Sequence, residues 1–322
     1  MKKILIFVLL LAGLVISGCG PTTTSGQTFI GGNKGLETAF LQGSPPPETF
    51  DGGQSGFAIV VDLKNIGEDD IKANEGYVKI LGLDPGAYGG TNDFKKPFPE
   101  DIRGAKRQFD GTVLEGGRVQ VDFGELKYAP VIQGNIIQKV WADTCYIYTT
   151  KTTAQLCIKK DPQLMVGNQK ICDVEGEKSP QNSGAPIEVS SLKETFGGSE
   201  KLGITLVLSH KGTGDAFFDP REAECDDSVT NIKRGKVKVL VKPVKIGGRD
   251  VTPECSGLSD GNGKNEGYIR LGDGTGTAQY SLYCSIDVSS IDSIFEVPID
   301  IETTYRYLQH NEVDMTIRHV AK

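Results

Sequence analysis

The chain has 322 residues, with 35 Lys and Arg against 42 Asp and Glu, and a formal net charge of −7 at pH 7. This length is sufficient for two domains of ordinary size. The acidic balance argues against nucleic acid as a partner, because phosphate backbones are bound by basic surfaces. Glycine is frequent, with 41 residues, whereas tryptophan occurs once, which favours turns and short strands over helices.

The first twenty residues have the pattern of a secretory signal. Two lysines give a positive start, Ile4–Ile16 is an apolar run, and small residues precede Cys19. In a helix this run covers about 20 Å, less than the roughly 30 Å of a bilayer core, so a retained membrane anchor is the weaker interpretation. Ile16–Cys19 resembles the lipobox of prokaryotic lipoproteins. That resemblance implies a signal peptide at residues 1–18, lipidation of Cys19, and membrane anchoring on the extracytoplasmic side, at the cell surface or facing the periplasm.

Residues 19–35 are expected to be the lipidated cysteine and a flexible tether, because the segment is rich in threonine and glycine. Removing the 18 signal residues leaves 304, and the loss of Lys2 and Lys3 changes the charge from −7 to −9. Outside the signal the apolar runs have the length of strands, so no further membrane-spanning segment is expected.

Two copies of one unit follow the tether. Phe57–Gly67 aligns with Leu202–Gly212 at an offset of 145, and Gly76–Leu81 aligns with Gly235–Leu240 at an offset of 159. The increase places an insertion within residues 215–234 of the second copy. Three further matches keep the offset of 159, namely Gly117–Phe123 with Gly276–Leu282, Asp143–Tyr148 with Glu302–Tyr307, and Leu156–Ile158 with Met315–Ile317.

The aligned segments alternate apolar and polar residues with a period of two, which is typical of half-buried strands. Phe57, Ile59 and Val61, for example, share one face of their strand. Many short strands of this kind predict an all-β fold of two tandem immunoglobulin-like antiparallel β-sandwiches. We place the sandwiches at residues 36–160 and 185–321, and a connector rich in turn-forming residues at 161–184.

One turn has a family resemblance. Asp62–Asp70 contains a strand end followed by Asn65-Ile66-Gly67, and this pattern resembles CARDB-like and related immunoglobulin-like surface modules. The second copy has His210-Lys211-Gly212 there and lacks the Asn. The resemblance covers about 40 residues of each copy. It implies the fold and carries over no functional residue.

The cysteines predict disulfides. Besides Cys19 there are six, an even number for an exported chain, and no two lie closer than 12 residues, so no CxxC metal motif is present. Asp143–Tyr148 and Ala154–Ile158 are predicted to form a hairpin whose loop centres on Lys151, which places Cys145 opposite Cys157. The second copy has a Thr pair at these positions, Thr304 and Thr316, so both cysteines are replaced together.

A Cys145–Cys157 bridge is therefore expected. The four remaining cysteines allow three connectivities. Cys225–Cys255 is favoured because these two flank the strand Lys236–Val244, and it leaves Cys172–Cys284 to tie the connector to the second sandwich.

The sequence lacks the common motifs of hydrolases, zinc proteases and nucleotide-binding proteins. The sequence has no GxSxG, HExxH or GxxxxGK[ST], so no catalytic, cofactor or metal site is expected and the chain is not predicted to be an enzyme. His210 falls in a turn and His310 in the predicted hairpin loop of the second copy, neither with a locatable nucleophile. Glu68–Asp70 is expected to be exposed charge.

The segment Gly82–Gly111 is long for a connection inside a sandwich and has no clear periodicity. It combines aromatic and basic residues, which are enriched at interface hot spots. Two interpretations remain open: its aromatic residues close the end of the domain, or the segment is a contact surface. The candidate contact residues are Tyr88, Phe94, Phe98, Arg103, Arg107 and Phe109.

These features favour a membrane-anchored, non-enzymatic binding or structural module, in a surface assembly, in adhesion or as a spacer, with a protein or polysaccharide partner. One alternative is a ligand-capture lipoprotein that delivers a solute or polysaccharide to a membrane machine. Another is an accessory subunit of a secreted enzyme. A pocket between the sandwiches would favour ligand capture, whereas a flat aromatic patch or an exposed strand edge would favour the structural module.

Overall fold

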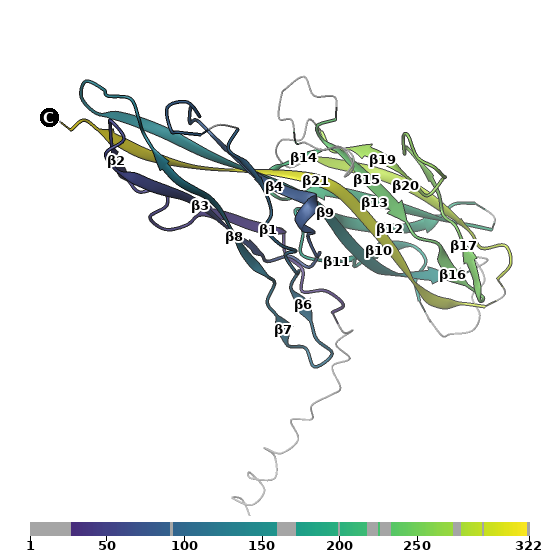
Figure 1. The fold of residues 1–322 in the computed structure, drawn as a ribbon. Helices are drawn as coiled ribbons and strands as arrows, with labels where there is room; N and C mark the ends of the chain where they lie inside the picture. Colours follow the sequence, from purple (N-terminus) through teal and green to yellow (C-terminus); the bar gives the residue numbers. More distant parts are fainter. Residues whose placement is uncertain are drawn as a thin grey trace, which may run out of the picture.

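The computed structural model describes residues 27–90, 93–159, 172–198, 200–217, 225, 233–272, 278–291 and 293–320. The predicted signal and Cys19 lie outside these residues. Within them every regular element is a strand apart from one 3-10 turn at Ala73–Glu75, so the predicted all-β sandwich class is confirmed. Figure 1 shows two lobes, joined by two long strands that run through both.

The first lobe contains a three-stranded antiparallel sheet in the order β1-β3-β8, formed by Leu36–Phe40, Gly56–Asn65 and Arg118–Lys127. The second lobe contains a five-stranded sheet in the order β10-β12-β13-β20-β18, formed by Gly176–Lys178, Ile187–Phe196, Lys201–His210, Gln279–Asp287 and Glu254–Ser256.

A nine-stranded sheet covers both of these sheets. Its main path is β19-β15-β21-β9-β4-β5, formed by Glu266–Arg270, Lys236–Val241, Phe295–Arg318, Ile136–Ile158, Gly76–Leu81 and Lys95–Pro97. Three short strands join this path, β2 (Glu48–Phe50), β11 (Gln181–Asn182) and β14 (Asp215–Phe217). Two separate ribbons pair β6 (Lys106–Arg107) with β7 (Val113–Leu114) and β16 (Val244–Ile246) with β17 (Arg249–Val251).

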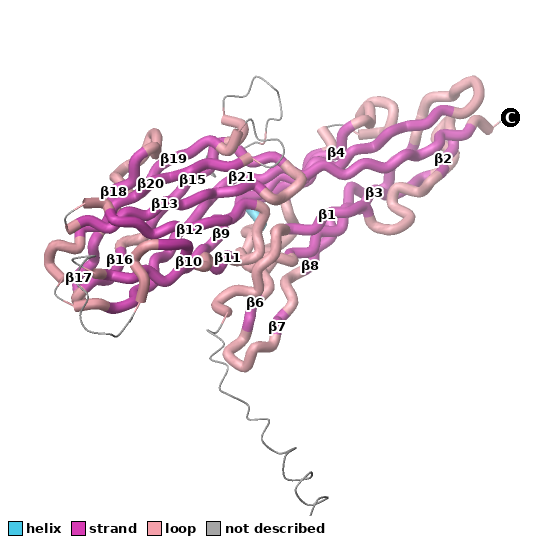
Figure 2. The backbone as a smooth tube through the Cα atoms, turned by 180° about the vertical axis from the view of Figure 1, so that it is seen from behind, coloured by secondary structure: helices cyan, strands magenta, loops and turns pink. Residues whose placement is uncertain are grey.

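The strands β9 and β21 pair with each other along their whole length. The antiparallel register runs without interruption from Ile136 opposite Ile317 to Ile158 opposite Phe295. At about 3.4 Å per residue this ladder is roughly 75 Å long. The lobes are therefore two ends of one continuous sheet, which is visible from behind in Figure 2.

The predicted repeat is confirmed by the topology, since β3, β4, β8 and β9 have β13, β15, β20 and β21 as counterparts. Ile147 pairs with Arg306, and these two residues differ by 159, which is also the repeat offset. The copies are thus related by an approximate twofold axis through this pair. The second half of each long strand lies in the lobe of the other copy, so the boundary predicted at residue 160 does not separate the lobes.

The predicted hairpin is wrong. Asp143–Tyr148 and Ala154–Ile158 are parts of the one strand β9, and Lys151 lies within it. His310 likewise lies within β21, and Thr304 is opposite Thr149 rather than Thr316. The reason is local: residues 149–153 read Thr-Thr-Lys-Thr-Thr, which contains no turn-forming residue and is rich in β-branched side chains that favour extended backbone.

Four tyrosines fill the core where the copies meet. Tyr146 faces Tyr307 and Tyr148 faces Tyr305 across the ladder, with ring centroids 5.9 and 6.4 Å apart. Neighbouring rings on each strand contact at 5.9 and 6.0 Å, which closes the cluster. All four side chains are fully buried. The cluster joins the cores of the two lobes, so hydrophobic burial as well as backbone pairing resists bending at this point.

All six of the predicted cysteines form bridges, which is typical of proteins from oxidising compartments. Each of the predicted pairings is wrong, however. The observed bridges are Cys145–Cys225, Cys157–Cys172 and Cys255–Cys284. Because β9 does not fold back, Cys145 and Cys157 lie far apart on one strand. Each is instead paired with a cysteine that lies outside β9.

Candidate interaction surfaces

Most of the aromatic side chains of Gly82–Gly111 belong to the core. Tyr88 and Phe98 are buried, and Phe94 packs partly against the same core. The Tyr88 ring lies 6.1 Å from Phe57 and 5.2 Å from Tyr128. The prediction that these aromatic residues form a contact surface is therefore wrong for Tyr88 and Phe98, and the alternative interpretation, closure of the domain end, holds for them.

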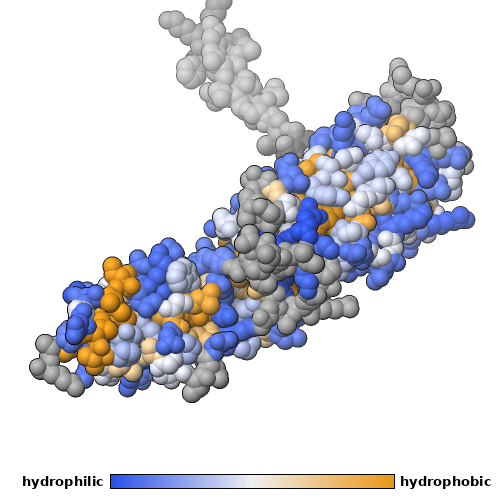
Figure 3. Space-filling model, turned by 90° about the horizontal axis from the view of Figure 1, so that it is seen from above, coloured by the Kyte–Doolittle hydropathy of each residue, from blue (hydrophilic) through white to orange (hydrophobic). Residues whose placement is uncertain are grey.

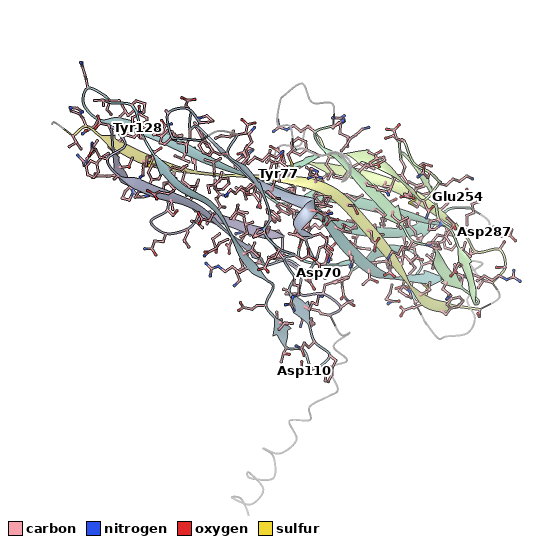
Figure 4. All side chains as sticks on the ribbon, in the orientation of Figure 1. Asp70, Tyr77, Asp110, Tyr128, Glu254 and Asp287 are labelled. Carbon is pink, nitrogen blue, oxygen red and sulfur yellow. A yellow bond between two sulfur atoms is a disulfide. The ribbon has the colours of Figure 1, made fainter. Side chains whose placement is uncertain are left out.

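The outer part of this segment is different. The β6–β7 ribbon projects from the middle of the molecule, away from both lobes (Figure 2), and Asp110 lies at its outer end (Figure 4). Next to it Phe109 is 103% exposed, and Val113 and Leu114 are 49% and 53% exposed. We call these three apolar residues, together with Arg103, Lys106 and Arg107, the hairpin surface. Arg103, Arg107 and Phe109 are the predicted contact residues that remain accessible.

The base of the ribbon is held by the acidic turn Glu68–Asp70, which was predicted to be free surface charge. The Glu68 carboxylate accepts hydrogen bonds from the backbone of Ile30, Gly31 and Gly184 at 2.8–3.0 Å. Asp70 accepts from Gly104 at 2.8 Å and forms an ion pair with Lys106 at 3.4 Å. The expectation of exposed charge is thus wrong for Glu68 and Asp69, which are partly buried, and holds for Asp70, which is exposed. The carboxylates fix the N-terminal segment, the connector and the hairpin base together.

Asp69 connects the same turn to β9, one of the two long strands that run through both lobes. Its Oδ2 accepts a hydrogen bond from the backbone of Thr149 in β9 at 2.8 Å, and its own backbone donates to the Tyr148 hydroxyl. Burial raises the pKa of Asp69 to about 6, although the bond from Thr149 opposes this change. The protonated form is therefore favoured in the folded protein more than in the unfolded chain.

We expect the stability contributed by Asp69 to be present in full below pH 4 and to be lost as the pH rises through about 6. Wild-type protein should lose about 3 kcal/mol of unfolding free energy over that range from this group, and Asp69→Asn should not. Urea denaturation at a series of pH values measures both. Asp70→Asn is the matched control and changes the profile with the opposite sign, since its folded pKa is lowered. Parallel wild-type and Asp69→Asn profiles would contradict the assignment.

A second exposed apolar region lies at the end of the first lobe. Val131 and Ile137 are 69% and 75% exposed, and Phe50, Ile136 and Val320 are also partly exposed there. Figure 3 shows apolar side chains gathered at this end of the molecule, and Tyr128 marks it in Figure 4. We call these five residues the tip surface.

Asp51 brings the segments of the tip surface together. Its buried carboxylate accepts hydrogen bonds from His319 Nδ1 at 2.7 Å and from the backbone of Ile132 and Val320 at 3.0 Å. The bond from His319 is the main cause that lowers the pKa of Asp51 to about 2. The sequence analysis missed the tip surface because its residues come from three distant segments, around Phe50, Val131–Ile137 and Val320. The adjacent Ile136 and Ile137 were the only local signal.

A pocket lies between the lobes. It has a volume of about 340 Å³ and is lined by residues 33–38, by the 211–213 turn of the second copy, and by β21 residues that include Gln309 and His310. His310 Nδ1 lies 2.8 Å from Asp143 Oδ1 on the adjoining strand. Beside this pair Trp141 donates a hydrogen bond from Nε1 to Glu312 at 3.1 Å. Asp143, Trp141 and Glu312 line a neighbouring pocket, which shares His310 and Asn311 with the first.

In the part of the chain that the structure describes, no group of three His, Cys, Asp or Glu side chains could hold a metal ion. The same residues include no helix long and apolar enough to cross a bilayer. The described residues do offer exposed apolar surface and the adjoining pockets at His310.

Comparisons with known proteins identify no family. No family model matches the chain, and no curated protein matches it. Among solved structures, a serine-rich repeat adhesion glycoprotein from Streptococcus agalactiae matches over 91% of this chain and 99% of its own, at 7% identity and a TM-score of 0.17. That score is too low to support a shared fold or function.

Proposed function

We propose that the protein is a membrane-anchored extracytoplasmic lipoprotein that acts as a non-enzymatic binding or structural module. The observation that carries this proposal is the β9–β21 ladder, which makes both lobes one rigid unit. A hinge between the two lobes would have to break backbone hydrogen bonds of this ladder and separate the four tyrosines of the core. A rigid body of this kind holds a surface at a fixed distance from its attachment point, as a spacer or adhesin does.

The tip surface is where we expect a macromolecular partner to bind. Its exposed apolar side chains lie at the end of the first lobe, and Asp51 fixes the backbone around them. Rigid presentation lowers the entropic cost of binding. Exposed apolar patches of this kind are typical of protein interaction sites.

Ligand capture is the second candidate, and the pocket between the lobes favours it. Trp141, the single tryptophan, lines an adjoining pocket that shares His310 and Asn311 with it. A solute seated there would change the fluorescence of Trp141. Titration of the purified protein with candidate solutes tests this alternative directly.

The main proposal is tested with the full-length protein in the cells that express it. Wild-type protein should fractionate with membranes, whereas Cys19→Ser should be released or remain an uncleaved precursor, because stable anchoring needs the attached acyl chains. A processed Cys19→Ser protein that stays in the membrane fraction would contradict lipid anchoring.

Crosslinking and affinity capture of the same cells then test the tip surface. Ile137→Asp should remain membrane-bound and lose its crosslinked partner, whereas Tyr283→Asp, a substitution at a partly exposed aromatic residue of the other lobe, should keep it. Equal recovery with both variants would remove the tip surface from the proposal.

A further inference from the structure

The hairpin surface exposes three large apolar side chains to solvent. Phe109, Val113 and Leu114 lie within six consecutive residues on a two-stranded ribbon that extends away from both lobes (Figure 1). Phe109 is as exposed as it would be in an extended peptide. Exposed apolar groups gathered in this way mark a contact site or a membrane-binding site.

The charges next to these side chains are basic. Residues 103–118 carry four cations and two carboxylates, a net charge of +2 in a chain whose total is −7. Lys106 is ion-paired with Asp70 and Arg118 with Asp62. Within the described residues, no carboxylate forms an ion pair with Arg103 or Arg107. Arg103 is exposed just before β6 and Arg107 is partly exposed within it, so in the described part of the chain these guanidinium groups have no carboxylate to compete with an anionic surface. Guanidinium matches phosphate geometry well.

The tether begins at this same place. Gln27, the first described residue, accepts a hydrogen bond from Arg107 Nη2 at 3.4 Å, and the next residues are fixed by Gln181 and Glu68. Seven residues lie between Cys19 and Gln27, and an extended chain over these eight Cα-to-Cα steps spans at most about 29 Å. A bilayer that holds Cys19 therefore lies within reach of the hairpin surface.

We propose that the hairpin surface is a second membrane contact, with Phe109, Val113 and Leu114 in the interfacial region of an anionic bilayer and Arg103 and Arg107 on lipid phosphates. This inference deepens the proposed lipid anchoring and rests on it for its cellular setting. An acyl anchor and a basic apolar patch are two signals of the kind that together give stable binding. Because the ribbon projects from the middle of the molecule, the contact holds the lobes alongside the bilayer, with the tip surface directed sideways.

The test uses a secreted, disulfide-bonded chain that begins at Gly20 and carries no lipid. The described residues begin at Gln27, so a chain that begins at Gly20 retains all of them. The probe is a vesicle of phosphatidylcholine with about one third phosphatidylglycerol, compared with pure phosphatidylcholine, in a sedimentation assay. The chain should bind the anionic vesicles, and the triple variant Phe109→Ser, Val113→Ser, Leu114→Ser should bind at least about tenfold more weakly.

Two further variants report on charge and insertion. Arg103→Gln with Arg107→Gln should remove the preference for anionic vesicles and most of the salt dependence. Phe109→Trp in a Trp141→Phe background should shift its emission to the blue on anionic vesicles, as a ring that leaves water does. Tyr283→Ser is the matched control and should bind as the unmodified chain does.

Failure to bind either vesicle, or equal binding by the unmodified chain and the triple variant, would overturn the membrane contact. Concentration-dependent self-association through Phe109 without vesicle binding would overturn it as well. None of these outcomes depends on acylation, so they are distinct from a failure of Cys19 anchoring, which the cell fractionation measures separately.

Discussion

Replacing Cys145 and Cys225 together by alanine is expected to lower the free energy of unfolding by about 4.5 kcal/mol, the largest loss among the three bridges. The entropy removed from the unfolded chain grows with the length of the closed loop. The sequence separations are 80 for this bridge, 29 for Cys255–Cys284 and 15 for Cys157–Cys172. The corresponding losses are about 4.5, 3.5 and 3 kcal/mol on the same model.

The first bridge has a further consequence for the structure. Cys145, Leu308 and Phe217 form a small buried cluster on the outer face of the nine-stranded sheet, and Cys225 packs against it. Arg306 Nη1 lies 3.6 Å from Cys145 Sγ within the same cluster. Figure 4 places Tyr77 at this point of the waist, and its hydroxyl accepts a hydrogen bond from the backbone of Cys225.

Denaturant titration of the three double-alanine variants provides the measurement. Each variant removes one complete bridge and leaves no free thiol, so the two other bridges serve as matched controls for the first. An equal loss from all three, or a smaller loss from the Cys145–Cys225 pair than from Cys157–Cys172, would contradict the expectation.

The second large effect is expected from Gly67→Ala, at about 3 kcal/mol. A Cβ at Gly67 would lie 2.0 Å from the Tyr148 hydroxyl and 2.3 Å from the Gly184 carbonyl oxygen. The equivalent Gly212 has the same restriction, with the Tyr307 hydroxyl at 2.1 Å. The Tyr148 hydroxyl accepts from the backbone of Asp69 and the Tyr307 hydroxyl from that of Gly214, so neither ring can move away without losing a hydrogen bond.

Gly86→Ala is the matched control, because its nearest neighbour to a new Cβ is a side-chain oxygen at 3.5 Å, an ordinary contact. It should change the unfolding free energy by less than about 1 kcal/mol. Thermal and urea unfolding of Gly67→Ala, Gly212→Ala and Gly86→Ala give the comparison. If Gly67→Ala unfolds like Gly86→Ala, the turn is looser than the Tyr148 contact implies.

Each copy of the repeat depends on the other for part of its sandwich, because the two long strands cross between the lobes. The second half of β21 pairs with β9 in the first lobe, and the second half of β9 does the same in the second lobe. Neither copy closes its own sandwich with its own residues alone. The two copies therefore form one folding unit, with no boundary at which either could fold alone. The same pairing of β9 with β21 makes the molecule a rigid spacer.

The sequence by itself determined the class of fold and the repeat. Period-two alternation identified Phe57–Leu63 and its counterpart Leu202–Leu208 as half-buried strands, because side-chain alternation depends only on the strand's own backbone. The even number of cysteines predicted three bridges for the same kind of reason, since redox state depends on compartment rather than on contacts. The exposed Phe109 was among the predicted contact residues as well.

Only the tertiary structure decided which segments meet. A strand that folds back on itself and a strand that continues into the other lobe have the same alternation, so the pattern around Lys151 could not distinguish a hairpin from strand exchange. The partners of Cys145 and Cys157 depended on that choice. Tyr88 was predicted as a contact residue and Asp69 as exposed charge, and both are wrong for a related reason. The burial of an aromatic ring or a carboxylate depends on segments far away in the sequence, here those of Tyr128 and Thr149. Local polarity carries no information about such segments.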